Sequence, residues 1–267
     1  MSSKLLLKPS FADNTLLSLH KRLFMSKPVV PYKNSEASKK KQVQKMFDGI
    51  SGEYDDLNRV ITFGIDLKWR RNLIRQIVQS NPNRVLDVAT GTGDLAIELA
   101  QRGVPEITGL DLSPGMLEIG KDKIKHQRLG THIEMVIGDS EQLSFEDNTF
   151  DAVTVAFGVR NFENLKMGLK EILRVLKPGG LLGILETSVP SNPIVKMGYM
   201  LHSNLLLPGV GRLFSKDGNA YGYLSKSATK FPYRSDFISI LESVGFINCK
   251  YESQTLGVAC LYFGSKL

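Results

Sequence analysis

The chain has little cysteine and histidine and no long apolar run. Of its 267 residues only Cys249 and Cys260 are cysteines, and four are histidines. The two cysteines fit no disulfide or metal-ligand spacing, which predicts reduced thiols in the core and no metal site. No apolar stretch approaches the ~18 residues that span a bilayer. The sequence therefore predicts neither a disulfide-built scaffold, nor a metal centre, nor a membrane-spanning helix.

Positive charge is concentrated at the N-terminal end. Residues 1–45 carry ten Lys or Arg and two acidic residues, a net +8 against +7 for the whole chain, so the remainder carries −1. A nearly neutral body argues against a nucleic-acid-binding face. We expect residues 1–33 to form a basic arm, either a solvated tail or one attracted to an anionic membrane at roughly 1 kcal/mol per basic residue. The first 24 residues also fit a weak transit peptide, or an extension upstream of a start at Met25.

Short β-type runs alternate with helical patterns from Arg84 onward. This alternation predicts an α/β fold with a parallel sheet and helices on both of its faces. The expected strands are Arg84–Ala89, Glu106–Asp111, His132–Gly138, Phe150–Phe157 and Leu181–Glu186. Two further β-like runs within Phe246–Leu267 indicate a closing hairpin rather than another βα unit.

Capping residues predict where several helices begin and end. Ser113 followed by Pro114 starts one helix, and Gly245 ends another that begins at Ser235. A third helix carries Leu165, Leu169, Ile172, Leu173 and Leu176 and stops at Pro178-Gly179-Gly180. A helix before the sheet follows a capping Asp66. We expect one domain over residues 34–267, with an N-terminal helical lid at 34–82 and an apolar insertion at 188–232.

A glycine-rich turn follows the first expected strand. Gly91, Thr92 and Gly93 separate that strand from a helix, and glycine there lets a ligand approach the backbone where a Cβ would collide. Ala96 stands where a dinucleotide fingerprint has its third glycine. The turn alone therefore fits either NAD or S-adenosylmethionine.

Acidic residues at the next strand ends favour S-adenosylmethionine. Asp111 ends the second strand, where a carboxylate accepts from the ribose hydroxyls of either cofactor. Asp139, after the third strand, is placed to accept a hydrogen bond from the adenine amino group. An acidic residue at this third strand end favours S-adenosylmethionine over NAD. Ala156-Phe157-Gly158, at the exit of the fourth strand, is expected to form the floor under the methionine group. The alternative is that both acids only cap helices, which the order of three strand ends disfavours, because ligands bind at the carboxyl ends of such sheets.

Four segments resemble the UbiE/MenG quinone-biosynthesis C-methyltransferases. They are Tyr54–Trp69, Phe157–Asn161, Arg174–Ser188, and Tyr223-Leu224 with Phe231-Pro232. Within Arg174–Ser188 the selective part is Glu186-x-Ser188, since the preceding R-V-L-K-P-G-G is common to many methyltransferases. The chain departs from the family's pattern at Leu57, Asp66 and Ala156, where the family often has Met, His and a cofactor-contacting Ser.

The resemblance covers about residues 30–267 and implies a Rossmann-like class I methyltransferase fold. Such a fold has seven mostly parallel strands, helices on both faces and an antiparallel last strand. The resemblance also implies S-adenosyl-L-methionine as cofactor and assigns Thr92, Asp111, Asp139 and Ser140 to its contacts. The implied reaction is C-methylation of a prenylated quinol. Short bacterial members that act on demethylmenaquinol in menaquinone biosynthesis are most similar, and the ubiquinone pathway is the alternative.

The implied substrate is a lipophilic small molecule, and no nucleic-acid partner is expected. The many apolar side chains of the insertion suit such a substrate, either by lining a channel for its isoprenoid tail or by packing as an accessory helical layer. We expect a cytoplasmic enzyme. Peripheral contact with the anionic inner face of the membrane, and a homodimer, are open alternatives.

Catalysis requires a ring carbon aligned behind the sulfonium methyl group and a route for the ring hydroxyl proton. Arg160 is the first candidate, to orient a water or stabilise the developing phenolate, since a guanidinium is nearly always charged. Asn161 is a second residue that can hold the hydroxyl, and Tyr54 on the lid is a third. The alternatives are an ion-pairing role for Arg160 and a core position for Tyr54.

Three other functions remain possible from the sequence. One is a class I methyltransferase acting on a sterol, phenol or fatty acid. A nicotinamide oxidoreductase is disfavoured by Asp139 and by the R-V-L-K-P-G-G segment. A non-catalytic quinone-binding subunit is disfavoured by Gly91, Gly93 and Asp111, because it would have no need for a methyl-donor pocket.

Overall fold

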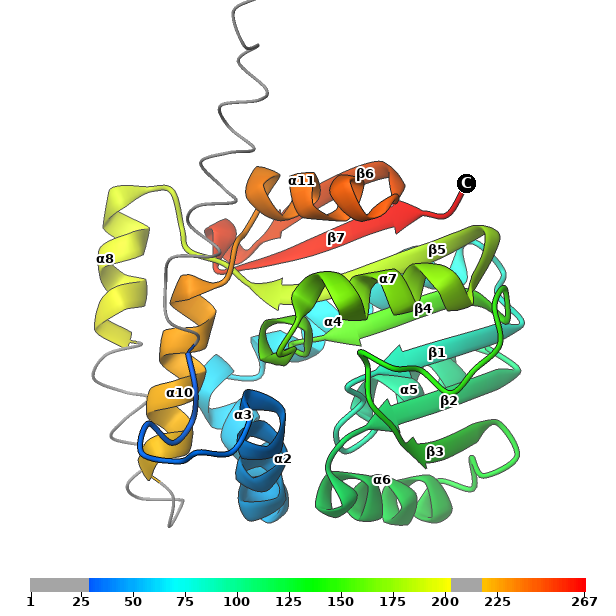
Figure 1. The fold of residues 1–267 in the computed structure, drawn as a ribbon, viewed down its shortest axis with the longest axis horizontal. Coiled ribbons are helices and arrows are strands. Elements are labelled where there is room, and N and C mark those ends of the chain that lie inside the picture. The colour runs from blue at the N-terminus through cyan, green and yellow to red at the C-terminus, as the bar shows by residue number, and fades with distance from the viewer. Residues whose placement is uncertain (1–28, 203–217) are drawn as a thin grey trace, which may run out of the picture.

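The computed structural model describes residues 29–202 and 218–267. These residues form one seven-stranded sheet in the order β3-β2-β1-β4-β5-β7-β6 (Figure 1). The strands are β1 (Arg84–Val88), β2 (Glu106–Asp111), β3 (Ile133–Ile137), β4 (Phe150–Ala156), β5 (Leu176–Thr187), β6 (Ile247–Gln254) and β7 (Ala259–Ser265). Strand β7 pairs antiparallel with both β5 and β6, whereas the pairs among β1 to β5 are parallel. The prediction of a mostly parallel sheet with an antiparallel last strand is confirmed.

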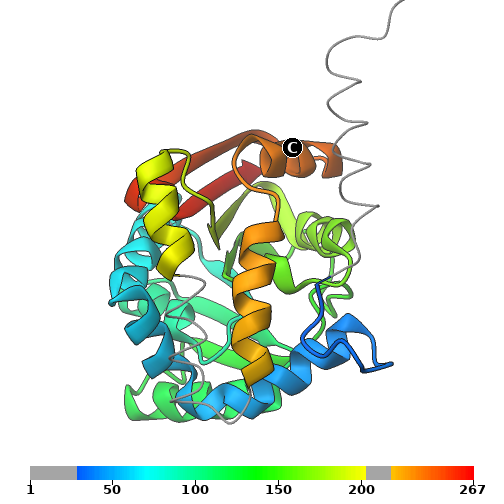
Figure 2. The same ribbon diagram turned by 90° about the vertical axis from the view of Figure 1, so that its left-hand side faces the viewer.

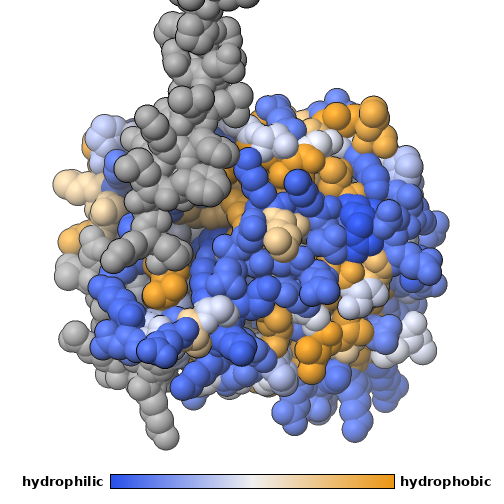
Figure 3. All heavy atoms as spheres, viewed as in Figure 1, coloured by the Kyte–Doolittle hydropathy of each residue, from blue (hydrophilic) through white to orange (hydrophobic). Residues whose placement is uncertain are grey.

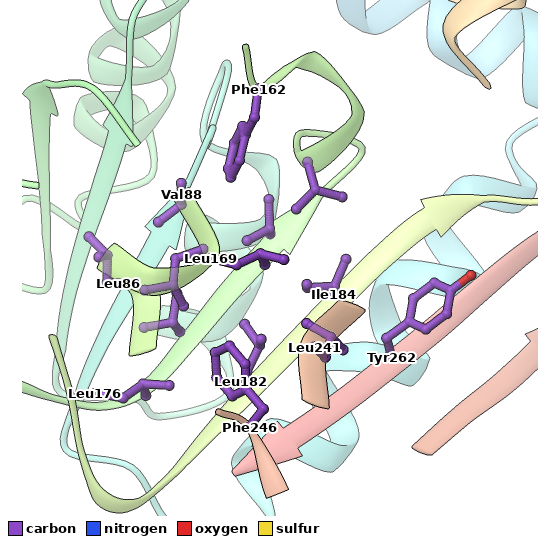
Figure 4. Close-up of a cluster of buried hydrophobic side chains, with 14 of the residues drawn as sticks. Leu86, Val88, Phe162, Leu169, Leu176, Leu182, Ile184, Leu241, Phe246 and Tyr262 are labelled. Atoms are coloured by element: carbon purple, nitrogen blue, oxygen red, sulfur yellow. The ribbon is translucent and has the colours of Figure 1, made fainter. Parts of the chain in front are cut away.

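Helices cover both faces of the sheet because its strands alternate apolar side chains between two cores. On β5, Leu182 and Ile184 face the first core, with helices α7 (Leu165–Val175) and α11 (Ser235–Val244) (Figure 4). Leu181 and Leu185 face the second core, with α4 (Ile65–Val78), α5 (Asp94–Gln101) and α6 (Pro114–His126). A strand buried on both faces is typical of a parallel sheet.

The remaining described helices gather beyond the carboxyl ends of the parallel strands (Figure 1). They are α2 (Lys39–Ile50), α3 (Tyr54–Thr62), α8 (Pro193–Leu201) and α10 (Gly218–Lys230), with the short turns η1 (Ser51–Glu53), η2 (Val159–Asn161) and η4 (Thr255–Gly257). None of the helices in residues 29–202 and 218–267 is long and apolar enough to cross a membrane.

The predicted caps at two helix ends agree with the structure. The Ser113 hydroxyl accepts from the Met116 backbone amide with Pro114 in the first turn of α6, and Gly245 takes the left-handed conformation that ends α11. The prediction for Asp66 is wrong. Gly64, at φ +71°, occupies the N-cap of α4, and Asp66 lies in the first turn as a buried partner of Arg59.

The predicted end of the third helix is also wrong. Helix α7 ends at Val175, and Leu176 is the first residue of β5, paired with Phe150. Strand β5 therefore begins five residues before the expected Leu181. Gly179, at φ +77°, lets the strand pass through the irregularity between Phe150 and Ala152. The helical periodicity included Leu176 because it is buried in the same core as the helix residues before it.

Of the expected basic arm, residues 1–28 lie outside the described residues, as does 203–217 of the apolar insertion. Within the expected lid at 34–82, α4 packs against the sheet through Leu73, Ile74 and Ile77. Helices α2 and α3 are the part of this segment that covers the strand ends.

Candidate active site

A pocket lies at the carboxyl ends of the central strands and encloses about 690 Å³, part of it open to solvent. Ala89 and Gly91 line it after β1, Asp111 at the end of β2, and Phe157 and Gly158 after β4. We call it the strand-end pocket.

The glycine-rich turn shapes one wall of this pocket. Gly91 (φ +59°) and Gly93 (φ +79°) both have left-handed backbones that favour glycine. The Thr90 hydroxyl donates to the buried Asp87 carboxylate at 2.6 Å, which fastens the turn to β1. A Cβ on Gly91 would come within 4.0 Å of the Tyr54 ring. The turn therefore leaves its backbone open toward the pocket beside Tyr54.

Asp111 lines the strand-end pocket as expected. Its two carboxylate oxygens accept from the backbone amides of Gly91 (2.8 Å) and Ser113 (2.9 Å). Each oxygen keeps further acceptor capacity for a ligand hydroxyl, because an ionised carboxylate has about four acceptor sites. Burial raises the pKa of Asp111, and the two amide bonds oppose that effect.

At the end of the third strand, Asp139 does not face the strand-end pocket as the sequence predicted. Ser140 lines the strand-end pocket, as do Lys40 and Glu141, but Asp139 is not among the lining residues. The Asp139 carboxylate accepts from Lys40 Nζ at 2.5 Å and from the Glu141 backbone amide. Lys40 was missed because it lies 99 residues before its partner, and only the fold brings the two together.

Thr92 and Gly93 do not line the strand-end pocket either. The Thr92 side chain is 2% exposed, donates to Asp55 Oδ1 at 2.7 Å and accepts from Lys123 Nζ at 3.0 Å. Lys123 also binds Asp55 and Asp94. Thr92 therefore joins α3 to α5 and α6 in this structure.

Helix α2 covers the strand-end pocket and is held at both ends. At its start, Lys39 Nζ donates to the backbone oxygens of Arg160 (3.0 Å) and Phe162 (2.6 Å). Near its end, Asp48 accepts from the Ser113 hydroxyl at 2.5 Å and the Gly115 amide at 3.1 Å. Burial lowers the pKa of Lys39 to about 8.

A second and larger cavity lies beside the strand-end pocket. It encloses about 1,860 Å³, again including open solvent, and α3, α4, α8, α10 and η4 supply most of its walls. Its lining is mainly apolar, with polar side chains that include Asn58, Asp66, Arg160, Thr187 and His202. We call it the helical cavity. Tyr54 and Phe157 line both spaces, so these two side chains form the wall at which the strand-end pocket and the helical cavity meet.

Arg160 lies in η2 and faces the helical cavity. Its Nη1 donates to Glu186 Oε1 at 2.5 Å, and the two side chains are only 9% and 0% exposed. Burial alone would lower the pKa of Arg160, but Glu186 and Tyr54 outweigh it and the pKa is raised. Arg160 is therefore a fixed cation. Glu186 Oε2 has no hydrogen-bond partner among the described residues.

Asn161 and Tyr54, the other expected catalytic residues, line the strand-end pocket. Asn161 Oδ1 accepts from the Tyr223 hydroxyl at 3.0 Å, which ties η2 to α10. The Tyr54 ring packs edge-on against Phe47, and burial raises its pKa. Sequence reasoning missed the support that Tyr223 and Glu186 provide. Both lie in the family motifs, but one sequence does not show which side chains they contact.

Known proteins resemble this chain over almost all of the described domain. A profile of the ubiE/COQ5 methyltransferase family matches residues 35–266. A demethylmenaquinone methyltransferase of Porphyromonas gingivalis is 45% identical over 240 residues, 89% of this chain and 98% of the relative. A ubiquinone/menaquinone biosynthesis C-methyltransferase UbiE of Geobacter sulfurreducens is 44% identical over 230 residues, 85% of this chain and 90% of the relative.

Among solved structures, a possible histamine N-methyltransferase of Thermotoga maritima has a TM-score of 0.58. It is 19% identical, with 84% of this chain and 99% of that one covered, and shows a shared fold alone. The sequence identities and the length of the family match are the stronger finding. The chain belongs to the ubiE/COQ5 methyltransferase family.

Proposed function

We propose that this methyltransferase transfers a methyl group from S-adenosylmethionine to a ring carbon of a prenylated hydroquinone, with demethylmenaquinol as the first candidate. One observation carries the proposal: two cavities, one at the strand ends and one among apolar helices, share Tyr54 and Phe157 as a common wall. A donor in one cavity and an acceptor in the other would meet there, next to Arg160. The names of the two bacterial relatives support a quinol as the acceptor.

The residues present fit S-adenosylmethionine in the strand-end pocket. Asp111 offers free acceptor positions to the ribose hydroxyls, and the left-handed Gly91 leaves room beside the backbone. Ser140 and Glu141 are polar side chains that line the pocket after the third strand, where the adenine is expected. Asp139, which is paired with Lys40 and does not line the pocket, would have to turn toward it to act there, and Thr92 would contribute by fastening the lid. Gly93 would preserve the turn.

The cofactor would supply an electrophilic methyl group on a sulfonium. In our proposal the ring carbon would take that methyl group, leaving the cofactor as a neutral thioether, and one proton would leave the substrate. In our proposal the cationic Arg160 stabilises the negative charge that develops on the ring oxygen, an effect that is strong in a site shielded from water. Asn161 and Tyr54 would hold the ring hydroxyl and exclude water. The apolar walls of the helical cavity would receive the isoprenoid tail.

Calorimetry and single-turnover kinetics test the proposal directly. We expect the protein to bind S-adenosylmethionine and S-adenosylhomocysteine but not NADH. It should then methylate a short-tailed demethylmenaquinol faster than the corresponding ubiquinone precursor. NADH binding without S-adenosylmethionine binding would contradict the cofactor assignment. Preference for the ubiquinone precursor would instead move the enzyme to that pathway.

The cellular setting also stays a proposal. We propose a cytoplasmic enzyme with peripheral contact at the anionic inner face of the membrane. Of the ten basic residues in 1–45 that motivated this contact, five lie in 1–28, outside the described residues, and the other five are Lys33, Lys39, Lys40, Lys41 and Lys45.

A further inference from the structure

Exposed apolar side chains lie on the segments that line the helical cavity. Phe63 is 79% exposed, Ile194 77%, Met197 70%, Leu201 62% and Leu256 76%. Phe63 itself lines the cavity, and each of the other four is the immediate chain neighbour of a lining residue: Val195, Gly198, His202 or Thr255. We call these five residues the cavity rim.

The cavity rim comes from three segments that are far apart in the sequence. Phe63 lies between α3 and α4, Ile194, Met197 and Leu201 on α8, and Leu256 in η4. The Phe63 ring lies 6.0 Å from the ring of His202 at the end of α8. Figure 2 faces the flank that carries α8 and α10. The contribution of three segments to the wall of one cavity distinguishes the rim from scattered exposed residues, which are normal on any surface.

Backbone strain at two rim positions supports a functional reason for their side chains. Phe63 (φ +51°) and Leu256 (φ +56°) both have left-handed backbones, which glycine adopts without strain and bulky residues rarely do. Each nevertheless carries a large apolar side chain into solvent. Strained residues of this kind cluster at functional sites.

The charge of the rim suits a lipid surface. Helix α8 contains no acidic residue, and its one charged side chain, the exposed Lys196, is basic. A basic side chain among exposed apolar ones is the composition of segments that lie at a membrane interface. Away from the left edge of Figure 3, where α8 lies, hydrophobic side chains form small groups among hydrophilic ones.

We propose that the cavity rim inserts into the surface of a lipid bilayer, so that the helical cavity opens directly into the lipid. This inference rests on the proposed function for the nature of the substrate, a quinol with an isoprenoid tail. A tail that enters through the rim passes from one apolar environment to another, which avoids exposing its apolar surface to water. The basic arm would add electrostatic attraction without defining where the cavity opens.

Vesicle binding by the full chain tests the rim. In neutral phosphatidylcholine vesicles at high salt, where attraction of the basic arm is screened, we expect binding to persist. Combined Ile194→Ser, Met197→Ser and Leu256→Ser should weaken it at least roughly tenfold, since each loses an inserted apolar side chain. The matched control is Ile137→Ser with Met167→Ser, which are 66% and 48% exposed on β3 and α7, away from the rim. Met197→Ser alone, on exposed α8, serves if the triple variant unfolds.

Turnover separates this proposal from the proposed function. The rim variants should methylate a short-tailed, water-soluble quinol like the wild type and lose rate only on a long-tailed quinol embedded in vesicles. Equal vesicle binding by rim variants and wild type, or equal losses in the control, would overturn the rim proposal. Sedimentation would also overturn it if the wild type were a dimer and the rim variants were monomers, because a second copy would then cover the rim. Absence of turnover by the wild type on the soluble quinol would count against the proposed function, since vesicle binding is measured without substrate.

Discussion

Glu186→Gln removes one charge from a buried ion pair while leaving its shape almost unchanged. Glu186 is fully buried and accepts from Arg160, whose side chain is 9% exposed and faces the helical cavity. Removing one partner of a buried pair costs about 3–5 kcal/mol, because the other charge stays buried without compensation. The introduced amide would still accept one hydrogen bond, so we expect the lower end, about 3 kcal/mol. For a domain of this size that lowers Tm by roughly 6–12 °C.

The same substitution should slow methyl transfer, because Glu186 holds the Arg160 guanidinium against the cavity wall. We expect Arg160→Ala to lower kcat by ~10²-fold or more, the usual scale for a charge-stabilising group. Arg160→Lys should recover little, since an ammonium lacks the planar fork of donors. Glu186→Gln should give a smaller fall in kcat, with KM and cofactor affinity nearly unchanged. A residue needed only for folding would lower Tm without changing kcat in the folded fraction.

A double-mutant cycle measures whether Glu186 acts through Arg160. In an Arg160→Ala background, Glu186→Gln should cause no further loss of kcat and should recover stability by removing the unpaired buried carboxylate. The assays are single-turnover transfer to a short-tailed demethylmenaquinol and thermal unfolding. Asp147→Asn is the control, since its partner Arg174 lies at the surface and such pairs contribute at most about 1 kcal/mol. Additive losses in kcat would refute the role of Glu186 as a positioning residue.

Three further substitutions test other parts of the site. Asp111→Ala should abolish the rise in Tm that S-adenosylhomocysteine causes by mass action, because it removes charge-assisted hydrogen bonds to the ribose that are worth about 1.5–3 kcal/mol. An unchanged rise in Tm would show that Asp111 does not belong to the cofactor site. Gly158→Val should lower both Tm and cofactor affinity, because even a Cβ at this position would lie 2.6 Å from the Ala89 Cβ. If titration calorimetry showed that the variant binds the cofactor with wild-type affinity, the tight contact would be disproved. Burial raises the pKa of Asp87 to about 6, so its stabilising contribution is complete below its unfolded pKa near 3.8 and is lost as the pH rises through 6. Denaturant unfolding should therefore show Asp87→Asn gaining stability relative to the wild type between pH 4 and 7, by an amount on the order of 3 kcal/mol, and a pH-independent difference would contradict it.

Local signals in the sequence were sufficient for most of the strands, for several helices and for the position of the pocket. The Ser113 cap, the Gly245 terminator and the glycine turn at 91–93 act through hydrogen bonds and backbone angles within a few residues. Few strand orders are then possible, because crossovers between parallel strands are almost always right-handed. Asp111 could be assigned to the pocket for the same reason: it ends a strand, and strand ends converge.

The sequence was therefore enough to predict the sheet, its glycine turn and the edge at which the strand-end pocket lies. Only the folded structure shows which polar side chains around that edge are already paired with one another. Lys40 occupies Asp139, Lys123 and Asp55 engage Thr92, and Glu186 holds Arg160, through partners 26 to 99 residues apart. The sequence shows that a carboxylate or hydroxyl is present, but it does not show whether another side chain already forms a hydrogen bond or ion pair with it. Its partner is set by long-range packing of helices over the strand ends, and the cavity rim arises in the same way from three separate segments.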